Sequence, residues 1–190
     1  MEYILQRAWE AGKDVYRKAL EVVEEGGARG SLKLEDFEKK VEVNGETYVV
    51  KVRGGGAEFD EGRGGRKLLR IRIKAEVGRV EGEHIVDRVV REYTITFGRY
   101  GGNEAVGFAY ARTDVPGGRE ADAERFSAPI KALTGREPKV YQKSGGKIMM
   151  KCSRWHLEGF ARYAELADDI ERWPEETSRK HDTDRGLEEG

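Results

Sequence analysis

Hydrophobic residues recur every three or four positions in three stretches of the 190-residue chain, at its beginning, past its middle and near its end. This spacing places them along one face of a helix, as in helices that pack against a core. It predicts helices over residues 2–25, 119–134 and 154–173. We expect the middle helix to be kinked or split at Pro129, because proline lacks the backbone N–H that a helix interior needs.

Between the helices, hydrophobic and polar residues alternate with the period of two that is typical of a strand with one buried face. The alternation predicts strands over residues 67–77, 89–97 and 105–111, and hairpins that turn at residues 44–45 (Asn-Gly) and 144–146. In residues 105–111 one face carries only glycine and alanine, so we expect another element to approach it closely. The order of elements favours an α+β fold, in which a mainly antiparallel sheet of about seven strands packs against N-terminal, middle and C-terminal helices.

The domain organisation follows from the same pattern. We expect an amphipathic helix over residues 1–27, one α+β domain over residues 28–174, and a disordered charged tail over residues 175–190. The glycine-rich residues 54–66 predict an exposed loop, and Arg-Gly-Gly units stand at residues 53–55 and 63–65. The chain has a single cysteine, which predicts no internal disulfide. It has no hydrophobic run of about 18 residues, which predicts no membrane span and no secretory signal. We therefore expect a cytoplasmic location.

The charges nearly cancel over the whole chain, because 35 Lys and Arg residues stand against 36 Asp and Glu residues for a net charge of −1. They are nevertheless segregated. Residues 63–74 contain basic side chains and no acidic one, and residues 136–154 contain one acid, Glu137. The first and last predicted helices and the tail are acidic. The neutral total therefore excludes a general polycation and leaves room for basic strands.

The alternation of the last hairpin concentrates this basic charge on one face. It places lysines around Tyr141 and puts hydrophobic residues such as Met150 on the opposite face. Such a ribbon can follow phosphates while the tyrosine stacks on a base. An ordinary solvated face has the same pattern in sequences that, like this one, are rich in Glu, Lys and Arg and poor in Asn and Gln, a bias associated with thermophiles. The predicted nucleic-acid-binding residues are Arg63, Arg66, Arg70, Arg72, Lys74, Lys139, Tyr141, Lys143, Lys147 and Lys151.

One pair of residues invites a catalytic interpretation. Cys152 and His156 lie four positions apart, as in a thiolate–imidazole pair. Cys152 continues a hydrophobic face, however, so a buried structural thiol is favoured. The three histidines and one cysteine lack metal-ligand spacing, and the glycine-rich segments lack phosphate-loop signatures. We therefore expect no catalytic residue, no cofactor and no metal site.

Four segments within residues 67–173 carry a resemblance to a known family: residues 93–100 (YTITFGRY), 107–111 (GFAYA), 117–125 (GGREADAER) and 156–167 (HLEGFARYAELA). They resemble the PaREP paralogous-repeat proteins of hyperthermophilic archaea. This resemblance extends over more than half of the chain. It implies an archaeal, thermophilic lineage and does not imply a particular activity.

Residues 123–166 carry a second resemblance. A helix ending in Leu-Thr-Gly, a Pro-Lys-Val-Tyr strand, another strand and a terminal helix are similar to the latter part of a LAGLIDADG homing-endonuclease domain, whose sheet binds DNA. The counterpart of that family's defining helix, residues 107–113, has Tyr110 and Arg112 where the family has acids, and it alternates like a strand. Without an acid to hold a divalent ion, the resemblance implies DNA binding without cleavage.

Together these observations predict a noncatalytic nucleic-acid-binding protein, with DNA favoured over RNA. A divalent-metal-dependent nuclease of the homing-endonuclease type is one alternative. A protein-interaction module without a nucleic-acid role is another, in which the first helix packs against a partner or against a second copy in a homodimer. No membrane partner is expected.

Overall fold

The computed structural model describes residues 28–100 and 104–173. The helix predicted at residues 1–27 and the tail predicted at residues 175–190 lie outside the described residues. Within them, seven strands form one antiparallel sheet in the order β1-β2-β3-β4-β5-β7-β6. The strands are β1 (Glu38–Val43), β2 (Glu46–Glu61), β3 (Lys67–Glu81), β4 (His84–Tyr100), β5 (Glu104–Tyr110), β6 (Lys139–Gln142) and β7 (Ile148–Cys152). The predicted antiparallel sheet is confirmed.

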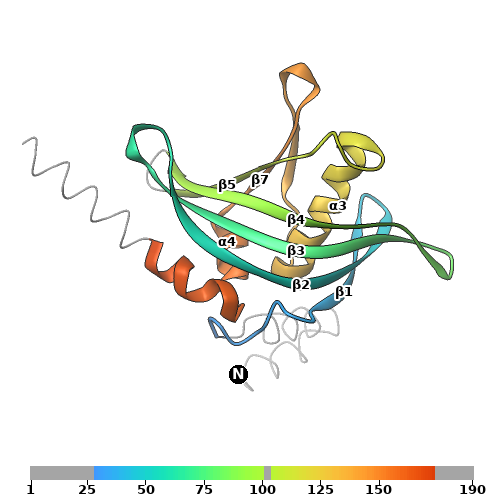
Figure 1. Cartoon of the computed structure of the whole chain (residues 1–190), viewed down its shortest axis with the longest axis horizontal. Helices are drawn as coiled ribbons and strands as arrows, with labels where there is room; N and C mark the ends of the chain where they lie inside the picture. Colours follow the sequence, from blue (N-terminus) through green and yellow to red (C-terminus); the bar gives the residue numbers. More distant parts are fainter. Residues whose placement is uncertain (1–27, 101–103, 174–190) are drawn as a thin grey trace, which may run out of the picture.

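Both predicted hairpins are present. β1 and β2 join at Asn44 and Gly45, whose φ angles of 51° and 79° are both positive, as a type I′ turn requires. β6 and β7 join through a short turn at Ser144–Gly146. Figure 1 shows the long strands β2, β3 and β4 running side by side across the molecule, with the tip of the β6–β7 hairpin projecting beyond them.

The first glycine-rich segment is not the exposed loop that the sequence predicts, because β2 continues through Gly54, Gly55 and Gly56 and pairs with β3. A Cβ atom on Gly55 would lie 2.5 Å from the Arg72 carbonyl oxygen and 2.9 Å from a methyl carbon of Leu34. Glycine therefore permits a close approach that any side chain would block. The end of the predicted loop does lie outside the strands, because Arg63–Gly65 form a short 3-10 helix without buried residues between β2 and β3.

The middle helix, α3 (Gly118–Thr134), begins and ends close to its predicted bounds and closes at Gly135, whose φ is 81°. It continues through Pro129 and is not split there. Phe126 and Ile130 on either side of the proline are at most 2% exposed, so burial of this stripe offsets the lost backbone hydrogen bond. No helix within the described residues is long and apolar enough to cross a lipid bilayer.

The last predicted helix is interrupted. α4 (Arg154–Phe160) begins after its N-cap, Ser153, and helical structure resumes at residues 164–173. Between these segments, Leu32 pairs with Tyr163 in an isolated bridge, and the Ala164 N–H donates to the Leu32 carbonyl at 2.7 Å. A segment from the other end of the described chain thus takes up backbone groups that a continuous helix would use.

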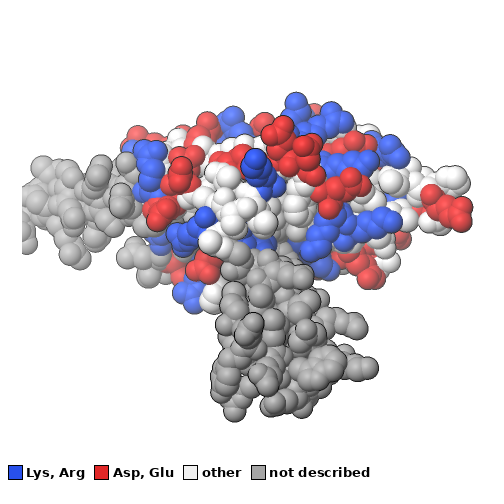
Figure 2. All heavy atoms as spheres, turned by 90° about the horizontal axis from the view of Figure 1, so that it is seen from below, with Lys and Arg blue, Asp and Glu red and all other residues white. Residues whose placement is uncertain are grey.

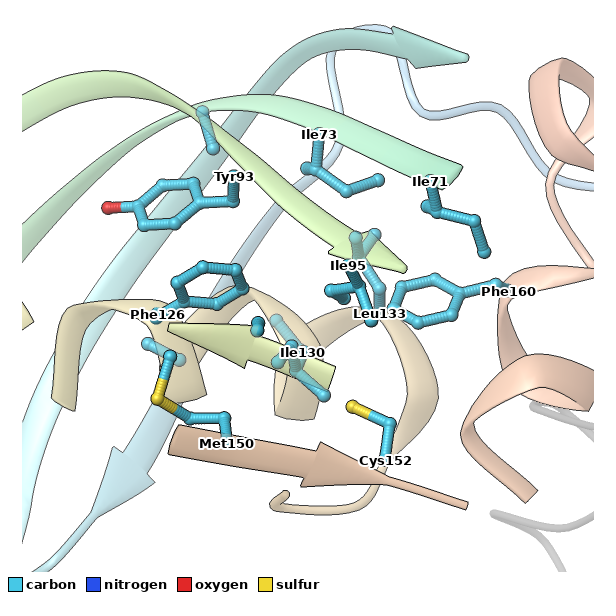
Figure 3. Close-up of a cluster of buried hydrophobic side chains, with 14 of the residues drawn as sticks. Ile71, Ile73, Tyr93, Ile95, Phe126, Ile130, Leu133, Met150, Cys152 and Phe160 are labelled. Carbon is cyan, nitrogen blue, oxygen red and sulfur yellow. The ribbon is translucent and has the colours of Figure 1, made fainter. Parts of the chain in front are cut away.

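The core lies between the sheet and the helices. Figure 3 shows side chains of β3 and β4 facing those of α3, β7 and α4; the labelled residues are Ile71, Ile73, Tyr93, Ile95, Phe126, Ile130, Leu133, Met150, Cys152 and Phe160. The small face of β5 also points inward, as expected, because a Cβ atom on Gly107 would lie 2.8 Å from the Phe97 ring. The opposite face of the sheet, here called the outer face, points away from α3 and α4.

Candidate nucleic-acid interface

The β6–β7 hairpin divides its side chains between two faces, as the alternation predicts. In the antiparallel register Lys139 lies opposite Lys151, and Tyr141 lies opposite Met149, so these four side chains share the outer face. Met150 points to the other face and is fully buried. The hairpin therefore presents two lysines and a tyrosine together.

Lys143 and Lys147 flank the turn of this hairpin. The Lys143 N–H donates to the Lys147 carbonyl at 2.7 Å, which closes the turn. Both side chains are exposed. They add positive charge at the projecting tip rather than on the sheet itself (Figure 1).

β5 contributes a second exposed tyrosine to the same face. Tyr110 lies opposite Met149, and Phe108 lies opposite Lys151. Met149 thus sits between Tyr110 and Tyr141 and is only 6% exposed, whereas the two tyrosines are 54% and 39% exposed. We call the group formed by Phe108, Tyr110, Lys139, Tyr141, Met149 and Lys151 the tyrosine surface.

Two further side chains extend the aromatic row toward β4. The Tyr100 ring packs edge-on against Phe108 with centroids 5.6 Å apart, and the Arg66 guanidinium lies 4.3 Å from the Tyr100 centroid. The structure thereby brings one of the predicted arginines next to the tyrosine surface. Arg63, three residues before Arg66, is exposed in the turn between β2 and β3.

The predicted arginines of β3 lie on the outer face but are paired with acids. Arg70 contacts Asp60 and lies 3.5 Å from Glu58, both on β2. Arg72 contacts Glu58 and lies 3.8 Å from Glu92 on β4. These partners cancel the positive charge that residues 63–74 carry along the sequence.

Lys74, the third predicted residue of β3, lies in register with Glu92. The β3 region of the outer face is therefore mixed in charge and differs from the tyrosine surface, where the two lysines form no ion pair with any described carboxylate. Figure 2 shows the same interspersion of Lys and Arg with Asp and Glu on the side seen from below. The basic tracts of the sequence do not merge into one positive face.

Cys152 and His156 are both buried, and their surroundings give them structural roles. Burial leaves Cys152 fully inaccessible and raises the pKa of its thiol to about 12. His156 Nδ1 accepts a hydrogen bond from the Ser153 N–H at 2.9 Å, and Nε2 lies 3.1 Å from the Glu137 carbonyl oxygen, to which it donates. Burial also lowers the pKa of His156. The imidazole is thus a neutral helix-capping group, and these contacts occupy both of its nitrogens.

The sequence prediction missed Phe108 and Tyr110 as site residues. The alternation of β5 already indicated that both side chains lie on the outer face, because Val106, Phe108 and Tyr110 alternate with the small residues that face the core. Which neighbours they would meet depends on the pairing of β5 with β7, which is not adjacent to it in sequence.

No group of three or more His, Cys, Asp or Glu residues within residues 28–100 and 104–173 is arranged to hold a metal ion. No protein-family model, curated protein or solved structure matches the chain.

Proposed function

We propose that this protein binds single-stranded nucleic acid without cleaving it, and that the tyrosine surface is the contact. The observation that carries the proposal is the pair of exposed tyrosines, Tyr110 and Tyr141, on the outer face beside two lysines that form no ion pair with a carboxylate of the described residues. The resemblance to LAGLIDADG domains favours DNA as the type of strand.

The geometry favours unpaired bases. Tyr110 and Tyr141 stand on β5 and β6 with β7 between them, so their backbones are about 10 Å apart across the sheet. Aromatic side chains on an open sheet can each stack on one base, but only bases outside a duplex expose their faces. The surface therefore suits a single strand better than a double helix.

The lysines are placed for the backbone of such a strand. Lys139 lies two residues before Tyr141 on β6, which corresponds to about 7 Å along the strand. Lys151 lies beside it on β7. An ammonium group at this separation can reach the phosphate of a base stacked on the tyrosine, and this contact adds affinity without sequence preference.

Fluorescence anisotropy with labelled 10-nucleotide DNA and RNA strands and a matched DNA duplex, each at two salt concentrations, tests the proposal. We expect the single strands to bind more tightly than the duplex and to weaken steeply as salt rises, because counterions are released from the phosphates. No binding of any single strand at low salt would overturn the proposal.

The double variant Tyr110→Ala/Tyr141→Ala tests the contact itself. We expect it to weaken binding at least about tenfold, because each stacked base contributes roughly 1–3 kcal/mol. Val90→Ala is the control, since Val90 is also an exposed hydrophobic residue, 48% accessible, on β4. A plasmid nicking assay with and without Mg²⁺ checks the noncatalytic part, and metal-dependent nicking by the purified chain would contradict it.

A further inference from the structure

A groove of about 430 Å³ opens at the base of the β6–β7 hairpin. Two of its lining residues, Lys139 and Lys151, also belong to the tyrosine surface. The others that matter for charge and stacking are Glu104, Arg136, Glu137, Arg154 and Trp155. This Trp155 groove therefore adjoins the proposed contact and shares its cations.

The charge of the groove is positive. Neither Arg136 nor Arg154 forms an ion pair with a described carboxylate. Of the two acids in the lining, Glu137 is bound by Lys131 at 3.1 Å. A concave surface with unpaired guanidinium groups concentrates positive potential and binds phosphate oxygens.

Trp155 gives the groove a stacking surface. It is 47% exposed, and the guanidinium carbons of Arg154 and Arg136 lie 4.6 Å and 5.7 Å from its ring centroid. An exposed indole flanked by arginines combines base stacking with phosphate contacts in one place.

We propose that the Trp155 groove is the second half of the strand-binding site, an inference that rests on the proposed function. A single strand that stacks on Tyr110 and Tyr141 passes Lys139 and Lys151 and enters the groove. There a base stacks on Trp155 and displaces an arginine guanidinium from the ring. The displaced guanidinium then binds a phosphate. The tyrosine surface and the groove thus form one continuous path.

The length of this path sets a minimum length for the bound strand. From Tyr141 to Arg136 the chain spans five residues, which is at most about 17 Å in extended conformation. Stacked nucleotides advance about 3.4 Å each, so up to about five cover this span, and the further 10 Å or so from Tyr141 to Tyr110 adds about three. Strands of three nucleotides are too short to occupy both halves, whereas strands of ten are long enough.

The test uses the full chain, a 10-nucleotide and a 3-nucleotide DNA strand, and two readouts. Tryptophan fluorescence reports stacking: we expect the 10-nucleotide strand to quench the wild type and to leave the fluorescence of Trp155→Phe nearly unchanged. Anisotropy reports affinity: we expect the 10-nucleotide strand to bind at least about tenfold more tightly than the 3-nucleotide strand, because it uses both halves of the path.

Arg154→Ala tests the phosphate contact. We expect it to weaken binding of the 10-nucleotide strand about tenfold and to reduce the salt dependence, the slope of log K against log salt, by about 0.7. Arg88→Ala is the control for loss of an exposed arginine away from the path, because Arg88 on β4 has 54% of its side chain accessible and lies 3.8 Å from Glu76. It should bind like the wild type.

The outcomes separate the two proposals. If the wild type binds the 10-nucleotide strand, but Trp155→Phe shows the same quenching and Arg154→Ala binds like Arg88→Ala, the groove is not part of the path and the proposed function stands. If the wild type binds no strand at all, the proposed function fails, and the inference about the groove fails with it.

Discussion

The carboxylate of Asp122 holds the end of β5, the strand that carries Tyr110. Asp122 lies on α3 and is fully buried. Each of its oxygens lies 2.9 Å from Nη1 of Arg91, whose side chain is only 9% exposed, and one oxygen also accepts from the Arg112 N–H at 2.7 Å. Arg112 follows Tyr110 by two residues, so this carboxylate ties α3 to β4 and to the end of β5.

Asp122→Asn removes the negative charge and keeps one acceptor oxygen. The Arg91 guanidinium then remains buried without a counter-charge. Breaking a buried ion pair from one side costs about 3–5 kcal/mol. We expect a loss near the lower end, about 3 kcal/mol, because the remaining oxygen still accepts one hydrogen bond. A domain with the usual stability of about 5–15 kcal/mol should remain folded.

Urea denaturation measures the free energy of unfolding of this variant. Asp114→Asn is the matched control, because Asp114 also pairs with an arginine, Arg112, at 2.5 Å, but its side chain is 65% exposed. An exposed pair is screened by water, so we expect no measurable loss from the control. Equal losses from Asp122→Asn and Asp114→Asn would refute the reasoning that burial gives the first pair its weight.

Three other predictions follow from local geometry. Gly55→Ala should lower the free energy of unfolding by about 1–3 kcal/mol, because the new methyl group would clash with the Arg72 carbonyl. Gly54→Ala should lower it less, because a Cβ there meets nothing within 4 Å. Equal losses of the two variants in denaturant titrations would contradict this. The folded chain keeps His156 neutral because burial lowers its pKa, and the unfolded chain binds a proton below about pH 6.5. Stability should therefore fall as the pH drops below that value, and His156→Gln, measured in the same pH series, should weaken this dependence. Because burial raises the pKa of the Cys152 thiol to about 12, Ellman's reagent at pH 8 should react with it only after denaturant is added, and rapid reaction of the native chain would be inconsistent with the structure.

Local sequence patterns predicted much of the sheet, because a strand with one buried face requires alternation. They failed where distant residues decide the structure. Gly55 lies in a strand because β2 pairs with β3 there, and Leu34 and the Arg72 backbone approach it so closely that a side chain would not fit. The last helix is interrupted because Leu32 pairs with Tyr163. Neither contact is visible in the local sequence.

The candidate site shows the same division. Lys139 and Tyr141 share a face because alternation within a hairpin fixes it. The net charge around β3 could not be judged from residues 63–74 alone. The acidic partners of Arg72 lie on the neighbouring strands, Glu58 on β2 and Glu92 on β4. Likewise, Tyr110 joins the site only through the pairing of β5 with β7. Charge summed along a sequence omits such neighbours across the sheet.

The central claim is that nucleic acid binds to the β5–β7–β6 part of the outer face and not to β3. Lys139→Glu and Lys74→Glu test it most directly, because both lysines are exposed on that face and neither forms an ion pair with a described carboxylate. Binding of the 10-nucleotide strand should weaken at least about tenfold in Lys139→Glu, with a salt slope smaller by about 0.7, and change less than about twofold in Lys74→Glu. Equal weakening by the two substitutions, or a larger effect of Lys74→Glu, would contradict the claim.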